Sequence, residues 1–171
     1  MSRLDWKEGG RFDRMREQQE IDGALRGHQN SQVEDEIAYY RWWPERSEMH
    51  AVYDEPTGDG LVFHPEVMVP VLHATHGEGS TQDSDTGFYF VDDLYVTASF
   101  EQVARTGLTD TDIRHENYLR DRVAYDNRLF RVNAIHVTGQ ISHKDFVLSI
   151  EAVHLKGDEL LLAPQFAGKF S

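Results

Sequence analysis

The sequence contains no cysteine, only five prolines, and no long hydrophobic run. Without cysteine, the chain has no disulfide framework, no thiolate nucleophile and no cysteine-based zinc site. Because a membrane-spanning helix needs about twenty mostly apolar residues, none is predicted. The first ten residues also lack the apolar segment of a signal peptide. These absences indicate a protein that folds in the cytoplasm and makes no contact with a membrane.

Basic residues are also scarce, with 17 Lys and Arg against 30 Asp and Glu and a formal net charge of -13. Because contacts with phosphate groups need a basic patch, the charge argues against a general nucleic-acid-binding protein. An acidic surface keeps a protein soluble. It would also suit a surface past which DNA must slide without sticking. The charge alone leaves both interpretations open.

Catalytic motifs are missing as well. The chain has no G-x-S-x-G elbow, no P-loop and no G-x-G-x-x-G turn. His73 and His76 are three residues apart, and this spacing on a strand points the two rings to opposite faces. Asp92 and Asp93 are adjacent and diverge in the same way, whereas paired acid catalysis needs convergent carboxylates. We therefore predict no catalytic residue, no metal site and no cofactor.

The centre of the chain, residues 121–155, has the pattern of three consecutive antiparallel strands. Arg122–Tyr125 is rich in strand-forming residues, and Asp126-Asn127 suits a two-residue turn. A long strand follows over Leu129–Gln140, and the return strand over Phe146–Leu155 comes after a polar turn. The segment therefore predicts a β-meander.

The apolar alternation changes phase within this meander. Phe130 and Val132 share one face, but Ile135 and Val137 continue the pattern one residue out of step. Such a slip is what a β-bulge produces. The return strand also changes face, near Val153. Two neighbouring strands that both change face favour a strongly coiled sheet, so we predict a mainly β fold with a small antiparallel β-barrel and short helices. A flat sheet that is apolar on both faces is the alternative.

Further strands are predicted before the meander. Their ranges are Glu48–Tyr53, Leu61–Phe63, Glu66–Thr75 and Phe88–Phe100, and a short helix is expected over Thr111–Leu119. Pro70 has no N–H, so its strand should lie at a sheet edge or be bulged. Asp92-Asp93 should mark another bulge.

Gly77–Gly87 has no apolar side chain and contains three glycines and the acids Glu78, Asp83 and Asp85. It is expected to form an exposed loop. Long loops between strands often carry function, although a tolerated surface insertion would look the same.

Residues 1–40 form a charged, partly helical N-terminal extension, and residues 41–171 the β-barrel domain. A weak helix is expected over residues 11–22, ended by Gly23 and Gly27. A second short helix is expected over Ser31–Tyr40, because Ser31 and Glu34 have the spacing of a capping box. The extension buries little apolar surface, so it should be disordered alone or docked on a neighbouring subunit.

Trp42 and Trp43 belong to a block of four aromatic residues in five positions, closed by Pro44. Tryptophan and tyrosine are enriched in cores and at interfaces, and both roles are open here. Phe12 and Met15 lie in the thin apolar stripe of the N-terminal helix. We take Trp42, Trp43, Phe12 and Met15 as candidate subunit-interface residues.

Four motifs, taken in order, resemble a head-to-tail connector protein of the stopper class in tailed phages that infect actinobacteria. The resemblance covers about residues 40–166 and leaves out the N-terminal extension. The motifs are YRWWP at Tyr40–Pro44, GFYFVDDL at Gly87–Leu94, ENYLRDRVAYD at Glu116–Asp126 and KGDEL at Lys156–Leu160.

The resemblance implies a structural virion protein of the neck, assembled in the host cytoplasm. It would form a homo-oligomeric ring, sixfold or twelvefold, between the portal or adaptor-side connector and the tail terminator or tail-tube protein. A loop in the place of Gly77–Gly87 would reach into the channel and help retain genomic DNA, which passes through without specific binding. Glu78, Asp83 and Asp85 would line that channel.

Two other functions are considered beside the connector. An acidic binding module for a basic partner or a glycan would be a stable monomer with an exposed aromatic platform at Trp42 and Trp43. A small metal-dependent β-barrel enzyme would gather His, Asp and Glu side chains in one pocket.

Overall fold

The structure of the 171-residue chain is a computed structural model. The structure describes residues 14–28, 35–50, 52, 56–57, 60–84, 87–108, 116–141, 144–155, 160 and 162–170.

A single antiparallel sheet dominates the described residues, which confirms the prediction of a mainly β fold. Its seven strands within these ranges follow the order β2-β1-β5-β6-β7-β4-β3. The strands are β1 (Asp35–Tyr40), β2 (Val67–Val71), β3 (His73–Ser84), β4 (Gly87–Ser99), β5 (Arg122–Tyr125), β6 (Arg128–Ile141) and β7 (Lys144–His154). The helices are α1 (Arg14–His28), α2 (Phe100–Arg105) and the 3-10 helices η3 (Glu116–Arg120) and η4 (Pro164–Phe166).

The sheet is curled but not closed, so the predicted barrel is not confirmed. Its edge strands, β2 and β3, are consecutive in the chain and are separated only by Leu72. The N–H of Leu72 donates to the carbonyl oxygen of Thr97 at 2.7 Å, and His73 then pairs with the same residue of β4. One bent segment therefore changes partner from β1 to β4, and its two halves have no ladder between them in the described residues.

Two apolar clusters lie on opposite faces of the sheet. The larger cluster fills the concave side and includes Ile37, Val96 and Phe130. The smaller one includes Leu129 and Phe166, so that β6 supplies neighbouring residues to both. Burial on both faces explains why the apolar pattern of this region does not keep one phase.

The central meander is confirmed. The turn between β5 and β6 has positive φ angles at Asp126 (46°) and Asn127 (60°), as a two-residue hairpin turn requires. The register between β6 and β7 shifts between Val132 and Ala134, which is the expected bulge. Pro70 lies on β2, an edge strand that pairs only with β1 in the sheet order, also as expected.

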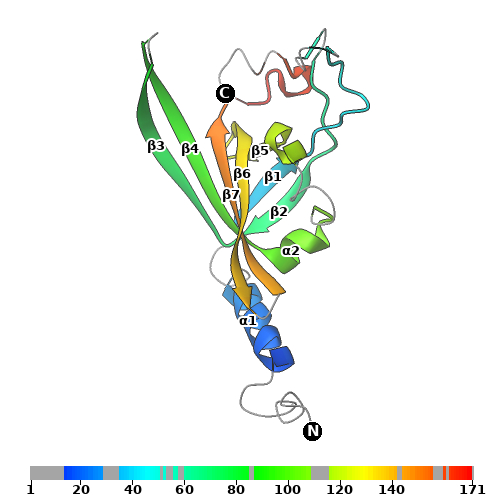
Figure 1. Ribbon diagram of the computed structural model, residues 1–171, viewed down its shortest axis with the longest axis vertical. Helices are drawn as coiled ribbons and strands as arrows, with labels where there is room; N and C mark the ends of the chain where they lie inside the picture. The colour runs from blue at the N-terminus through cyan, green and yellow to red at the C-terminus, as the bar shows by residue number, and fades with distance from the viewer. Residues whose placement is uncertain are drawn as a thin grey trace.

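The prediction of a loop over Gly77–Gly87 is wrong for Gly77–Ser84, which belongs to β3, and for Gly87, which begins β4. Ser80–Ser84 pairs with Gly87–Val91, and the register shifts opposite Asp92, where a bulge was expected. The strand-forming residues Phe88–Val91 take the polar segment as their partner, so pairing decides its structure rather than its own weak propensity. Pairing of β4 with β7 begins only at Asp93, so the parts of β3 and β4 beyond the Gly77–Asp93 pair, here called the hairpin, project beyond the sheet (Figure 1).

The N-terminal expectations need two corrections. Helix α1 continues through Gly23 and Gly27 to His28, because an isolated glycine lowers helix stability without ending the helix. Asp35–Tyr40 is strand β1 between β2 and β5, not the end of a second helix, and Ile37 is fully buried there. The sheet therefore includes residues 35–40. A domain boundary at residue 40 stays a prediction.

Other local expectations differ in detail. In place of the strands expected at Glu48–Tyr53 and Leu61–Phe63, the described residues there show isolated bridges from Met49 to Pro56 and from Trp42 to Phe63. The helix expected at Thr111–Leu119 is described only from residue 116, where it is 3-10 helix. Helix α2 was not anticipated. None of the described helices is long and apolar enough to cross a membrane.

Candidate functional site

A buried carboxylate holds the aromatic block in place. Asp121, which is only 4% exposed, accepts a hydrogen bond from the Tyr39 hydroxyl at 2.7 Å through Oδ2. Its Oδ1 accepts from the backbone N–H of Trp42 at 2.8 Å. One side chain thus ties the end of β1 to the junction of η3 and β5. Sequence reasoning missed Asp121, because its partners lie about eighty residues away in the chain.

A hydroxyl fixes the next turn of the chain. The indole N–H of Trp42 donates to Ser47 Oγ at 2.9 Å, and Ser47 Oγ donates to the Trp43 carbonyl at 2.8 Å. The Val62 N–H also donates to Ser47 Oγ, at 3.0 Å. These hydrogen bonds therefore fix the conformation of the loop that carries Trp42 and Trp43.

Cationic and aromatic side chains cover both indole rings. The Arg46 guanidinium lies 4.2 Å from the centroid of the Trp43 ring, and His64 stacks on that ring at 4.3 Å with an interplanar angle of 10°. Arg120 lies 4.5 Å from the centroid of Trp42. The two arginine–indole contacts contribute about 0.5–1 kcal/mol each at exposed sites. We call these five residues the tryptophan cluster.

The tryptophan cluster borders a hollow of about 350 Å³, whose lining also includes Arg41, Glu45 and Asp121. Both tryptophans are half-buried, so each combines packing with an accessible edge. Tryptophan and arginine are the residues most enriched at the energetic centres of protein interfaces. The geometry therefore suits the docking of a partner side chain.

Two tyrosines, the buried Tyr40 and the half-buried Tyr125, donate hydrogen bonds to carboxylates. Burial, together with a 2.8 Å hydrogen bond to Glu66, raises the pKa of Tyr40 to about 12. The hydrogen bond to Asp35 at 2.7 Å, with burial, raises the pKa of Tyr125 to about 12. Both hydroxyls therefore stay protonated near neutral pH and act as structural donors.

Helix α1 is held to α2 by an ion-pair cluster. Arg26 donates to both carboxylate oxygens of Glu101, at 2.6 and 2.8 Å, and Arg105 donates to Glu101 at 2.8 Å. The hydrogen bond from Arg26 lowers the pKa of Glu101. The first part of the helix extends away from the sheet (Figure 1), and Met15 there is 67% exposed. Phe12 lies outside the described residues.

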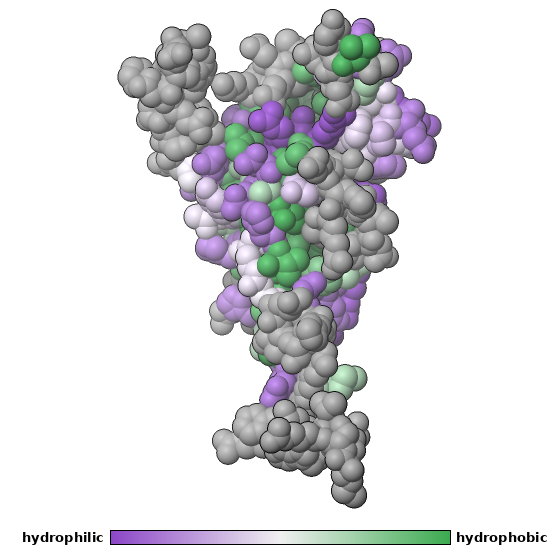
Figure 2. All heavy atoms as spheres, viewed as in Figure 1, coloured by the Kyte–Doolittle hydropathy of each residue, from purple (hydrophilic) through white to green (hydrophobic). Residues whose placement is uncertain are grey.

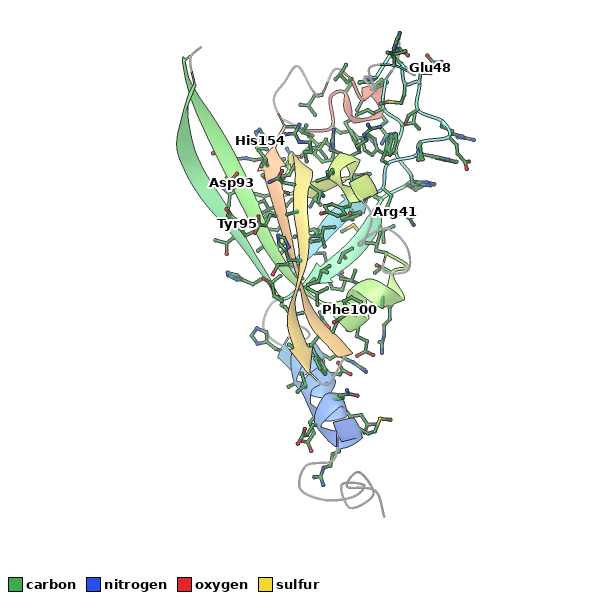
Figure 3. The ribbon with its side chains drawn as sticks, viewed as in Figure 1. Arg41, Glu48, Asp93, Tyr95, Phe100 and His154 are labelled. Carbon is green, nitrogen blue, oxygen red and sulfur yellow. The ribbon has the colours of Figure 1, made fainter. Side chains whose placement is uncertain are left out.

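The residues predicted to line a channel lie elsewhere. The backbone of Glu78 and Asp83 belongs to β3 within the hairpin, and Asp85 lies outside the described residues. Figure 3 shows Asp93 and Tyr95 at the left of the view, near the hairpin, and Arg41 at the right. The structure therefore separates two candidate surfaces, the hairpin and the tryptophan cluster.

The surface between the hairpin and the tryptophan cluster carries both hydrophobic and hydrophilic side chains. In Figure 2, hydrophobic side chains appear in small groups among hydrophilic ones. The described residues contain no group of three or more His, Asp or Glu that could hold a metal ion.

Comparisons with known proteins do not assign this chain to a family. No family model matches the chain, and no curated protein matches it. Among solved structures, a chain from the virion of a native gene transfer agent (GTA) particle is similar, with 12% identity and a TM-score of 0.47. The match covers 71% of this chain and 94% of that chain. A likeness at this level does not indicate the function of this chain.

Proposed function

We propose that this chain is a structural protein of a phage-like virion and, more specifically, a head-to-tail connector of the neck. Copies of the chain would form a ring between the portal side and the tail, and the ring would help retain packaged DNA. The resemblance of four ordered sequence motifs to the stopper class carries the proposal. The role is one of assembly rather than catalysis.

The projecting hairpin supports this role. Residues 80–84 and 87–91 form a two-stranded ribbon, since β7 pairs with β4 only from Asp93 onwards. A two-stranded ribbon is marginally stable by itself in water, so its partner is expected outside this chain. Glu78 and Asp83 place acidic residues on β3 of this hairpin. In a channel, their charges would keep DNA phosphates from adhering.

Truncation of the hairpin tests this role. Replacing Thr81–Phe90 with Asn-Gly would join Ser80 directly to its partner Val91 through a turn that suits a hairpin. We expect the sheet to fold and the particles to assemble, while filled heads lose DNA. The measurement is the fraction of DNA-filled heads after storage. Normal DNA retention in assembled particles would exclude a retaining role for the hairpin.

Imaging of the virion neck tests the connector function itself. A closed ring of this chain around a channel, with the hairpins directed inwards, is the expected result. A monodisperse monomer that is absent from the particle would overturn the proposal.

An acidic binding module remains the second candidate, because the tryptophan cluster lies on the surface beside a hollow. That function predicts a stable monomer that captures a basic peptide or a glycan through Trp43. Loss of such binding in Trp43→Ala, without any effect on particle assembly, would favour it over the connector.

A further inference from the structure

Polar side chains from three strands meet where the hairpin leaves the sheet. Arg128 is the first residue of β6. Its Nη1 atom is 3.2 Å from Nε2 of His76, on β3. The same guanidinium atom is 3.5 Å from Oδ2 of Asp92 on β4. Strands β3 and β6 are not neighbours in the sheet order, since β4 and β7 lie between them. The contact therefore spans the concave side of the curled sheet.

The ring of Phe130 lies beneath this contact. Phe130 is fully buried and meets the His76 ring edge-on at 5.9 Å and the His154 ring at 5.5 Å. His154 ends β7 and lies at the end of the sheet from which the hairpin projects (Figure 3). The contact thus joins the base of the hairpin to the edge of the main core.

The protonation state of His76 follows from the chemistry of arginine. A guanidinium group only donates hydrogen bonds, so the Nε2 atom of His76 must accept the one from Arg128. An accepting Nε2 carries no proton, and the ring proton of the neutral imidazole is then on Nδ1. A second ring proton would place a donor and a cation against the Arg128 guanidinium.

We propose that His76 and Arg128 form a proton-sensitive latch between the hairpin base and the turn that begins β6. In neutral solution the latch is closed by the hydrogen bond from Arg128 to His76. In mild acid, protonation of Nε2 breaks that bond and frees the hairpin base from β6. The inference concerns the conformation of the isolated chain and does not rest on the proposed function.

The other charged groups at the site set the size of the effect. Asp92 lies next to Arg128 and would attract a protonated His76, which offsets part of the repulsion between the two cations. His154, whose ring also contacts Phe130, is a second imidazole near the site. On β3 itself, His73 is bonded to Thr75 at 2.6 Å.

The Arg128 and Asp92 side chains are 44% and 33% exposed, so solvent screens these interactions. We therefore expect a loss of protection at the hairpin base of about two- to fivefold in acid, the range for exposed charged pairs.

The tautomer of His76 gives the most direct test. Nitrogen NMR of the imidazole rings in the full chain distinguishes protonated from accepting ring nitrogens, and the spectrum of His76→Gln identifies the signals of His76. We expect an unprotonated Nε2 and a protonated Nδ1 in neutral solution. Observation of a proton on Nε2 under these conditions would overturn the latch.

Hydrogen exchange tests the consequence for the hairpin. Protection factors of the amides of residues 75–77 and 93–95, measured in neutral and mildly acidic buffer, should fall in acid for the wild-type chain. His76→Gln and Arg128→Gln should each abolish this difference, because one cannot titrate and the other lacks the opposing cation. His136→Gln, which changes an exposed histidine of β6, is the control and should keep it. An unchanged acid response in His76→Gln would contradict the proposal.

Discussion

At the scale of single residues, a buried carboxylate and a half-buried hydroxyl fix the loop that follows β1. Asp121 fixes the end of β1 through Tyr39 and Trp42, and Ser47 fixes the following turn. Each group joins segments that are distant in sequence or would otherwise lack regular structure. Since buried polar atoms cost free energy when they are left unpaired, these contacts specify one arrangement of the loop.

Replacement of Asp121 should therefore destabilise the fold. In Asp121→Asn, one carboxylate oxygen becomes an amide NH2 group, which cannot accept from Tyr39 or Trp42. We expect the free energy of unfolding to fall by about 1–3 kcal/mol, as measured by denaturant titration. Tyr39→Phe removes only one donor and should cost less. Equal stability of Asp121→Asn and the wild type would show that the carboxylate does not hold the loop.

The tyrosine–carboxylate pairs predict behaviour in alkali. The ordinary tyrosine pKa of 10.0 is raised to about 12 in Tyr40 and Tyr125, so each pair stabilises the fold below pH 10. That contribution is lost as the pH rises through about 12. In an ultraviolet absorbance titration, we expect two phenolates to appear late. Tyr40→Phe and Tyr125→Phe should each remove one late step, and a titration complete near pH 10 would contradict both assignments.

At the scale of secondary-structure elements, α1 and the hairpin are the two parts that extend from the sheet. Helix α1 has little apolar surface, and the ion pair between Arg26 and Glu101 links it to α2, within which Arg105 also pairs with Glu101. Helix stability in proteins comes mainly from packing of an apolar face. The docking of α1 therefore depends more on charge than does the rest of the fold.

Acid should loosen α1. The pKa of Glu101 is lowered below its ordinary value of 4.5, so the pairing stabilises docking above that pH and is lost as the pH falls through the lower folded value. We expect lower amide protection factors across α1 in strong acid, and the same change at neutral pH in Glu101→Gln. Glu20→Gln, which removes only the exposed pair with Arg16, is the control and should have little effect. Unchanged exchange in Glu101→Gln would show that the helix is held by other contacts.

At the scale of the whole molecule, the sequence patterns predicted the features that depend only on residues close to one another in the chain. The turn at Asp126-Asn127, the bulge before Ala134 and the edge position of Pro70 each follow from a local rule. The internal position of β1, next to the edge strand β2, does not, because its register with β5 joins Tyr39 to Val123, far along the chain. Local propensity carries no information about such pairings.

The same division applies to the candidate surfaces. Trp42 and Trp43 were recognisable from their density of aromatic side chains, whereas Arg120 and His64 reach them from other segments. The acids Glu78 and Asp83 were also recognisable, but their strand conformation depends on pairing with β4. The composition of the sequence therefore identified these candidate residues, but only the folded structure showed which other segments lie against them.

The tryptophan cluster provides a test of assembly for the molecule as a whole. If it is a subunit contact, Trp43→Ala should keep the fold while preventing ring formation, because truncation at an interface centre costs 2 kcal/mol or more on the general scale, about thirtyfold in affinity. Sedimentation and far-ultraviolet circular dichroism measure the two properties. Tyr95→Ala, on an exposed position of β4, is the matched control. Normal rings formed by Trp43→Ala would exclude this surface as a subunit contact.

The bend at Leu72 has a mechanical consequence. Because β2 and β3 are one continuous segment, a pull on the hairpin along its strands is transmitted through Leu72 to β2 and its ladder with β1. Interstrand hydrogen bonds of antiparallel strands lie across the strand direction, so such a load shears many bonds together instead of opening them one at a time. The hairpin is therefore anchored to resist tension applied along its strands.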